Sequence, residues 1–233
     1  MDVIEEMEDV MIQPSATASR SRGLILGCSL LLLSNCAYIP KGEYRGGLFV
    51  HTAPNYSFQV PDGWRRATVS DYPSFGFNQR LLQTFNETGR RAFMELAERE
   101  VRLYEALLIS SRGAWIHVEP AVNSDVRYPS GYKLNDQEKQ SIWQRVSAEL
   151  VRQAMPPDKP KLTLESMELV DYGPNTVLKL RFRSDVIRGL MYWTVLGFYS
   201  SSHVVAIWHV GIPEDRNEGA AGLEAIGRSF RFE

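Results

Sequence analysis

The C-terminal stretch 204–233, "VVAIWHVGIPEDRNEGAAGLEAIGRSFRFE", holds the pattern that decides the fold. It begins inside an expected strand over 203–212 that is apolar on both faces, which is typical of a central strand covered on each side. Pro213 then introduces an expected helix over 214–229. The helix residues expected to face the core are Ala220, Leu223 and Ile226. A buried strand followed directly by a helix predicts that layers of both kinds pack together.

Three more strand patterns precede this stretch and predict a largely antiparallel sheet. They cover 162–170, 176–184 and 189–199. In 176–184 apolar side chains alternate with basic ones, so one face of the strand is buried and the other is wet. The apolar positions are Leu178, Leu180 and Phe182, and the basic ones are Lys179, Arg181 and Arg183. The polar run "SSSH" at 200–203 predicts a hairpin between the last two strands.

Two helices are expected upstream of these strands. The clearer one follows Asn135, whose side chain can cap it, and Glu138 three residues later completes a capping box. The pair Pro156-Pro157 ends this helix because proline cannot continue the hydrogen-bond ladder. Apolar residues at spacings of three and four predict the other helix over 78–104.

The first part of the domain is expected to be made of short strands. They lie at 48–51, at 56–60 and on both sides of a turn at 111–113. A Pro-Asp-Gly turn leads from the second strand to Trp64, which we expect to return the chain to the core. The element order predicts a single α+β domain over 48–233, layered around a largely antiparallel sheet.

Two stretches resemble the two ends of proteins of the PsbP-like superfamily. They are "YSFQVPDGWRRA" at 56–67 and the C-terminal stretch 204–233. Members of this superfamily open with a strand followed by Pro, Gly and Trp, and they finish with a strand, a helix and a terminal strand. The resemblance implies an α/β/α layered sandwich over 48–233. It also implies binding or scaffolding more often than catalysis.

A hydrophobic stretch at 22–40, "RGLILGCSLLLLSNCAYIP", contains both cysteines of the chain. Its uncharged part, 23–33, suits the apolar region of a secretory signal and is too short to span a bilayer. It ends in Leu33-Ser34-Asn35-Cys36, which resembles the lipobox of bacterial lipoproteins, although Asn35 stands where Gly, Ala or Ser is usual. The resemblance implies cleavage before Cys36 and lipidation of its thiol.

Cys28 is the rival lipidation site, with Ile25-Leu26-Gly27 before it. Its apolar region would be too short for secretion, and four leucines would remain on the mature side, so Cys36 is favoured. We therefore predict that residues 1–35 are a signal peptide and that residues 36–47 are a tether rich in Pro, Gly and charge.

The acidic beginning "MDVIEEMEDV" does not suit a secretory signal, which needs positive charge at this place. Translation from Met11 would remove these acids and leave a signal with the basic residues Arg20 and Arg22. The lipobox resemblance further implies that Ala37 after the cysteine favours the outer over the inner membrane of a bacterium. Cleavage removes Cys28, so no disulfide is expected.

The charge of the folded part argues against nucleic acid as a partner. The whole chain has a formal net charge of −2, and basic and acidic residues are nearly balanced after Cys36, so a phosphate-binding surface for nucleic acid is not expected. The expected contacts are the membrane, through the lipid, and a protein of the cell envelope. The predicted function is a binding or assembly module in the bacterial cell envelope, and the alternative is an envelope enzyme such as a metal-dependent hydrolase.

Histidines are the candidates for such an enzyme. His117 and Glu119 share one strand face, and His203 and His209 share a face of another strand, so neighbouring strands could assemble a zinc site. The competing interpretation is four half-buried sheet histidines, since the chain has no HExxH, CxxC or GxSxG pattern.

The serine run 200–202 beside His203 is interpreted as a polar turn, because no acid is placed to orient the imidazole. We predict no catalytic, cofactor-binding or metal-binding residue. The tryptophans expected to be packing residues are Trp115, Trp143, Trp193 and Trp208.

Overall fold

The computed structural model describes residues 42–74, 82–83, 86–153, 160–186 and 189–233. The predicted signal peptide, the start at Met11, lipidation at Cys36 and the helix end at Pro156-Pro157 lie outside these residues. In the described part of the chain no helix is both long and apolar enough to cross a membrane.

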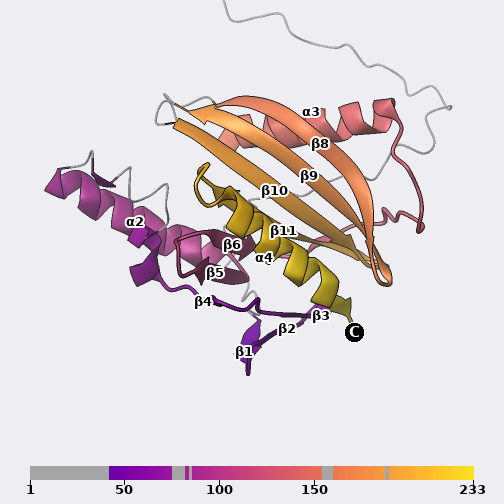
Figure 1. Ribbon diagram of the computed structural model, residues 1–233, viewed down its shortest axis with the longest axis horizontal. Helices are drawn as coiled ribbons and strands as arrows, with labels where there is room; N and C mark the ends of the chain where they lie inside the picture. Colours follow the sequence, from indigo (N-terminus) through magenta and orange to yellow (C-terminus); the bar gives the residue numbers. More distant parts are fainter. Residues whose placement is uncertain (1–41, 75–81, 84–85, 154–159, 187–188) are drawn as a thin grey trace, which may run out of the picture.

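A large antiparallel sheet is the centre of the fold (Figure 1). Its seven-strand path runs in the order β4 (Trp64–Arg66), β5 (Ala106–Ser110), β6 (Trp115–Val118), β11 (His203–Gly211), β10 (Gly189–Tyr199), β9 (Asn175–Val186) and β8 (Lys161–Tyr172). Strand β7 (Val122–Asn123) adds to β11 beside β6. The four long strands confirm the sequence patterns, and β10 and β11 form the predicted hairpin.

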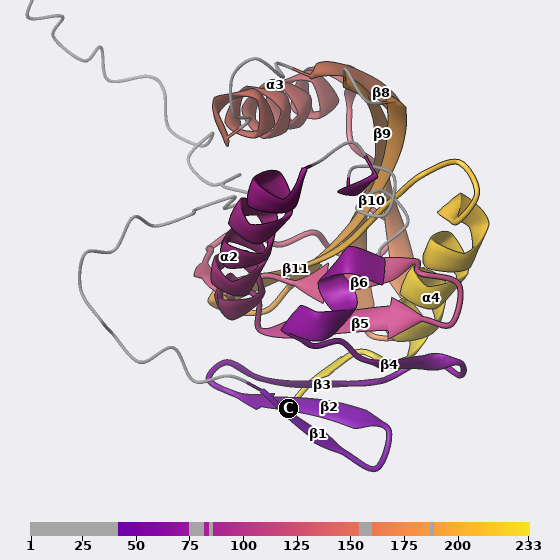
Figure 2. The same cartoon turned by 90° about the vertical axis from the view of Figure 1, so that its left-hand side faces the viewer.

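Helices cover both faces of this sheet (Figure 2). Helix α3 (Asp136–Gln153) packs Ile142 and Val146 against Leu180 and Phe182 on one face. Helix α2 (Glu87–Leu103) lies on the same side, whereas α4 (Arg216–Ser229) lies on the other. The predicted α+β fold with helices on both faces is confirmed.

A second, small sheet joins the two ends of the described chain. Its order is β1 (Glu43–Arg45), β2 (Leu48–Thr52), β3 (Asn55–Gln59) and β12 (Arg231–Phe232). Strand β1 falls within the range 36–47 predicted as a tether. That prediction is wrong at its end, because Glu43 pairs with Val50 and Tyr44 with Phe49. Tyr44 also packs its ring against Phe49, so the folded part begins before Leu48.

Local signals set several element ends. Asn135 accepts a hydrogen bond from the Glu138 main chain at 2.9 Å and Glu138 accepts one from the Asn135 main chain at 2.8 Å, which confirms the capping box. Helix α2 begins at Glu87 and not at the predicted residue 78, since Asn86 caps it by accepting from the Gly89 N–H at 2.8 Å. A six-residue 3₁₀ helix, η1 (Val69–Ser74), precedes it.

Trp64 returns the chain to the core as predicted, packing against the cluster between the two sheets. Gly222 of α4 makes room for it, because a Cβ there would lie 2.7 Å from the Trp64 ring. The α4 side chains Leu223 and Ile226 are buried as expected, whereas Ala220 is only half-buried and Gly219 takes the inward position.

Candidate functional site

His117 and His209, the two sheet histidines proposed for a joint zinc site, lie on opposite faces of the large sheet. His117 stands opposite Trp208 in the register of β6 and β11, while His209 stands opposite Ile116. Because side chains alternate along a strand, this register points the two imidazoles apart. The zinc site considered as an alternative from the sequence is therefore not formed. Among the residues that the structure describes, no group of three or more His, Cys, Asp or Glu could hold a metal ion.

His117 lies on the face covered by α2 and α3, within a set of aromatic rings. Its ring is stacked with that of Trp208, with centroids 6.1 Å apart, and lies 4.3 Å from the centroid of Tyr104. Burial lowers the pKa of His117 to about 3, so the imidazole is neutral, and its Nδ1 has no hydrogen-bond partner. Glu119 follows on the same face, and desolvation raises the pKa of its carboxyl to about 8.

His209 lies on the other face, beneath the first turns of α4. It is fully buried, and its Nδ1 lies 2.9 Å from the main-chain oxygen of Trp115, to which only a protonated Nδ1 can donate. Its Nε2 has no partner. The helix passes directly over the ring, since a Cβ on Gly219 would lie 2.0 Å from its Cε1 atom.

Two acids at the start of α4 accompany this histidine. A Cβ on Gly211 would lie 2.0 Å from Asp215 Oδ1 and 2.7 Å from His209 Cε1, so both side chains border the space that Gly211 leaves free. Both carboxyl oxygens of Asp215 and Oε2 of Glu218 are buried without a hydrogen-bond partner. Burial, aided by Glu214 and Glu218, raises the pKa of Asp215 to about 7. We call His209, Asp215 and Glu218 the α4 cluster.

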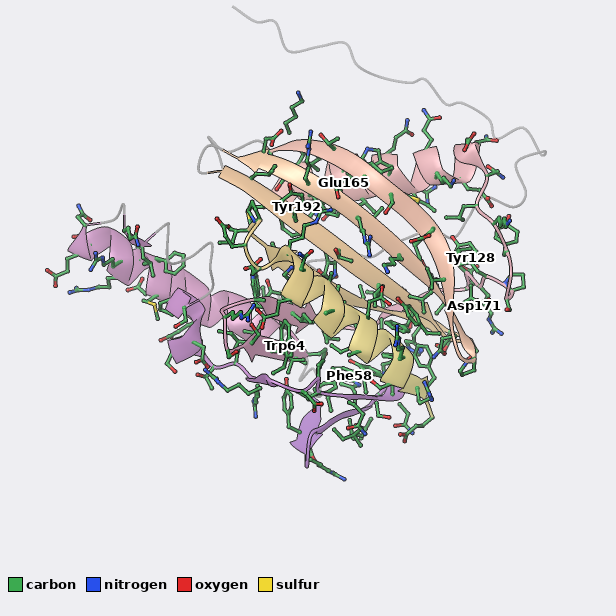
Figure 3. All side chains as sticks on the ribbon, in the orientation of Figure 1. Phe58, Trp64, Tyr128, Glu165, Asp171 and Tyr192 are labelled. Atoms are coloured by element: carbon green, nitrogen blue, oxygen red, sulfur yellow. The ribbon has the colours of Figure 1, made fainter. Side chains whose placement is uncertain are left out.

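An ion pair and a cation–π contact on the surface hold the same end of α4 against the sheet. The Arg216 guanidinium donates to Glu165 of β8 at 2.6 Å and lies over the Tyr192 ring, 4.0 Å from its centroid. Figure 3 shows Glu165 and Tyr192 on the long strands near the first turn of α4. Tyr192 in turn pairs with Gly211, so the contacts of Arg216 and the α4 cluster are neighbours.

The sequence matches no protein family and no curated protein. Among solved structures the chain is similar to PsbP. The solution structure of cyanobacterial PsbP (CyanoP) from Synechocystis sp. PCC 6803 is 13% identical over 86% of this chain and 99% of that chain, with a TM-score of 0.48.

The chain is also similar to LpqN of Mycobacterium tuberculosis, which is described as involved in cell envelope biogenesis. That crystal structure is 9% identical over 75% of this chain and 81% of that chain, with a TM-score of 0.41. Neither likeness bears on activity or partners.

The serine run forms the turn between β10 and β11, as predicted. Ser200 closes it, with its main-chain N–H donating to the His203 oxygen at 2.8 Å. The Ser202 hydroxyl lies 2.7 Å from His203 Nδ1, but both groups are exposed. Within the described residues no carboxylate is hydrogen-bonded to the other nitrogen of His203, so the arrangement lacks the acid of a catalytic triad.

The predicted packing role of the tryptophans is confirmed. Trp143, Trp193 and Trp208 belong to the core on the α3 side, and Trp115 packs beside α2. Phe182 lies between Trp143 and Trp193, with its ring centroid 5.5 Å from each.

Sequence reasoning missed a buried contact between His51 and Glu105. His51 Nε2 of β2 lies 3.1 Å from Glu105 Oε2, and each side chain is only 2% exposed. No local pattern could reveal it, because His51 lies in β2 and Glu105 lies between α2 and β5, segments that meet only after folding. Sequence reasoning also missed Asp215 and Glu218, which look like ordinary polar residues of a first helical turn. The available signal was Gly219, since glycine inside a helix often marks close packing.

Proposed function

We propose that this chain is a lipoprotein of the bacterial cell envelope whose folded domain is a binding or assembly module. The support from the sequence is the signal peptide pattern and the lipobox that ends at Cys36. An outer-membrane location is proposed from Ala37 after the cysteine. The partner is expected to be another envelope protein, because the nearly balanced charge after Cys36 does not favour phosphate binding to nucleic acid.

The observation that carries this proposal is the short distance along the chain from Cys36 to the first strand. Only residues 37–42 separate the cysteine from β1 at Glu43. At about 3.6 Å per residue this segment spans at most roughly 25 Å. A lipid at Cys36 would thus hold the small sheet next to the membrane, since β1 belongs to that sheet.

This placement orients the rest of the domain. Figures 1 and 2 both show α3, and the part of β8 beside it, at the end of the molecule opposite to β1. The surface of α3 and of that part of β8 would therefore face away from the anchoring membrane, where a partner protein can reach it. The titratable residues inside the domain are covered by packing, which suits binding through the outer surface better than a reaction inside.

The anchor is tested by mass spectrometry of the N-terminus. The expected product begins at an acylated Cys36 and is found in the membrane fraction, and a Cys36→Ala variant leaves that fraction. A Cys28→Ala variant is the matched control and should be processed normally. An unmodified Cys36 still joined to Asn35 would overturn the anchor.

Replacement of the Met11 codon with Met1 intact should abolish the product if translation begins at Met11.

The orientation and the partner are tested by photo-crosslinking in intact cells. A photoreactive residue at Gln144, exposed on α3, should give one discrete protein adduct, whereas one at Thr52, exposed on the small sheet, should not. The adduct should persist in detergent-solubilised envelope. If neither position gives a protein adduct while the anchor is confirmed, the binding function is wrong and the location stands.

A further inference from the structure

The α4 cluster contains hydrogen-bond acceptors with no donor among them. Nδ1 of His209 uses its proton on the Trp115 oxygen, which leaves Nε2 with a lone pair. The carboxylates of Asp215 and Glu218 can only accept when ionised. Nε2, both Asp215 oxygens and Oε2 of Glu218 are buried and unpaired, and His209 and Asp215 are 0% and 5% exposed. Buried acceptors without a donor are costly, and the cost is greatest for a charged group, so an ionised Asp215 is disfavoured.

We propose that the folded protein keeps one proton on Asp215, so that a neutral carboxylic acid stands beside a neutral imidazole in the α4 cluster. Protonation removes the charge that the buried Asp215 carboxylate would otherwise keep without a donor. This order is the reverse of that in water, where imidazole binds a proton more tightly than a carboxylate does. The inference is independent of the anchor and of the partner.

The charges around the cluster favour this state. Glu214, just before α4, and Glu218, in its first turn, both disfavour an ionised Asp215. Arg216, the cation of that turn, is engaged by Glu165. On β10 the groups that face the cluster are neutral: Thr194 stands opposite His209, and Tyr192 stands opposite Gly211.

Charged and titratable groups of the more distant strands do not reverse this balance. Arg181 and Arg183 of β9 lie one strand further away, opposite Thr194 and Tyr192. His117 of β6 lies behind the sheet and is neutral. Burial raises the pKa of Asp215 to about 7 and lowers that of His209 to about 4, in agreement with the hydrogen-bond argument.

The reversed order has a thermodynamic signature. Between about pH 4 and pH 6.5 the folded cluster holds its proton on Asp215, while the unfolded chain holds one on His209. Because both states bind one proton, the pair adds no pH dependence to unfolding in this range. When either residue is replaced, the other alone should make the free energy of unfolding depend on pH. The two dependences have opposite signs, so they cancel in the parent protein.

Asp215→Asn should leave only the lowered pKa of His209. Stability is then full above about pH 6.5 and is lost as the pH falls towards 4, with the unfolding constant rising about tenfold per pH unit relative to the parent protein. His209→Gln should leave only the raised pKa of Asp215. Stability is then full below about pH 4 and is lost as the pH rises towards 7, by about the same factor per unit.

The experiment uses the full chain in detergent, with urea unfolding followed from pH 4 to pH 7.5 and nitrogen-15 NMR of labelled histidines. The expected spectrum keeps the His209 ring neutral, with the proton on Nδ1, at pH 5.5. The control is Asp125→Asn at an exposed acid, which should follow the parent curve. A protonated His209 ring at pH 5.5 would mean an ion pair with Asp215 and would overturn the proposal, as would slopes of equal sign. If either variant fails to fold, the spectrum of the parent protein decides.

Discussion

His117 and His209 occupy adjoining strands of one sheet and yet face opposite helical layers. Each is neutral because it is buried, and each has one ring nitrogen without a partner. The zinc site considered as an alternative from the sequence is thus not formed, and the two histidines are buried separately. The contribution of each histidine to stability can therefore be tested separately.

Replacement of His117 by Phe should make the protein more resistant to acid. The pKa of His117 is lowered to about 3, so the unfolded chain gains its proton near pH 6.5 while the folded protein stays neutral. Stability from this group is therefore full above pH 6.5 and is lost as the pH falls towards 3. A phenylalanine ring at this position keeps the ring stack and removes that loss. Urea unfolding at pH 4.5 and pH 7 measures the difference, with His203→Phe at the half-buried start of β11 as the comparison.

Replacement of Gly219 by Ala should destabilise the protein by about 1–3 kcal/mol, because overpacking forces neighbours to move. The added methyl group would lie 2.0 Å from the His209 ring, whose Nδ1 is hydrogen-bonded to the Trp115 oxygen. Gly227→Ala in the same helix is the control, since its methyl group meets the Tyr172 ring at 3.1 Å. Denaturant unfolding of both variants gives the comparison. Equal stability of the two would contradict the close contact.

Replacement of Glu105 by Ala should cost about 1–3 kcal/mol of unfolding free energy, because it removes the hydrogen-bond partner of the buried His51 Nε2. A double-mutant cycle with His51→Phe measures the coupling. The exposed pair Arg45–Glu43 is the control, and its removal should leave stability unchanged. A similar loss for both pairs would show that burial does not set the strength of the contact between His51 and Glu105.

The ion pair between Lys179 and Glu224 should respond unequally to the loss of each partner. Glu224→Ala should cost about 2 kcal/mol, since Lys179 is 7% exposed and would be left unpaired, while partial exposure of Glu224 moderates the cost. Lys179→Met should cost little, because Glu224 keeps the 2.6 Å hydrogen bond from the Tyr172 hydroxyl. Thermal unfolding of the two single variants tests this order, and a larger loss for Lys179→Met would contradict it.

The sequence predicted most elements because each is specified by neighbouring residues. The alternation of Leu178, Leu180 and Phe182 with basic residues gave the face of β9 that packs against α3, and the capping box at Asn135 gave the start of α3. The opposite face of β9 was predicted to be wet, which is wrong at Lys179, because this residue is buried beside Glu224 of α4. The tether was predicted too long because β1 has only three residues and is stabilised by pairing with β2. A strand of that length carries no periodicity of its own.

The candidate site needed tertiary information at every step. Within one strand, parity tells that His117 and Glu119 share a face, but it cannot give the register against the next strand. A shift of one residue exchanges the two faces, and the observed register separates His117 from His209. The same holds for His51 and Glu105, which meet only after folding.

By itself, therefore, the sequence determined the elements, the α+β class and an expected lipid anchor, because these depend on short-range patterns of apolar, capping and signal residues. Only the tertiary structure decided which titratable side chains are buried, which of them meet and which lack a partner. Those properties depend on register, on helix placement over the sheet and on the room left by glycines such as Gly211 and Gly219, all of which arise from contacts between distant parts of the chain.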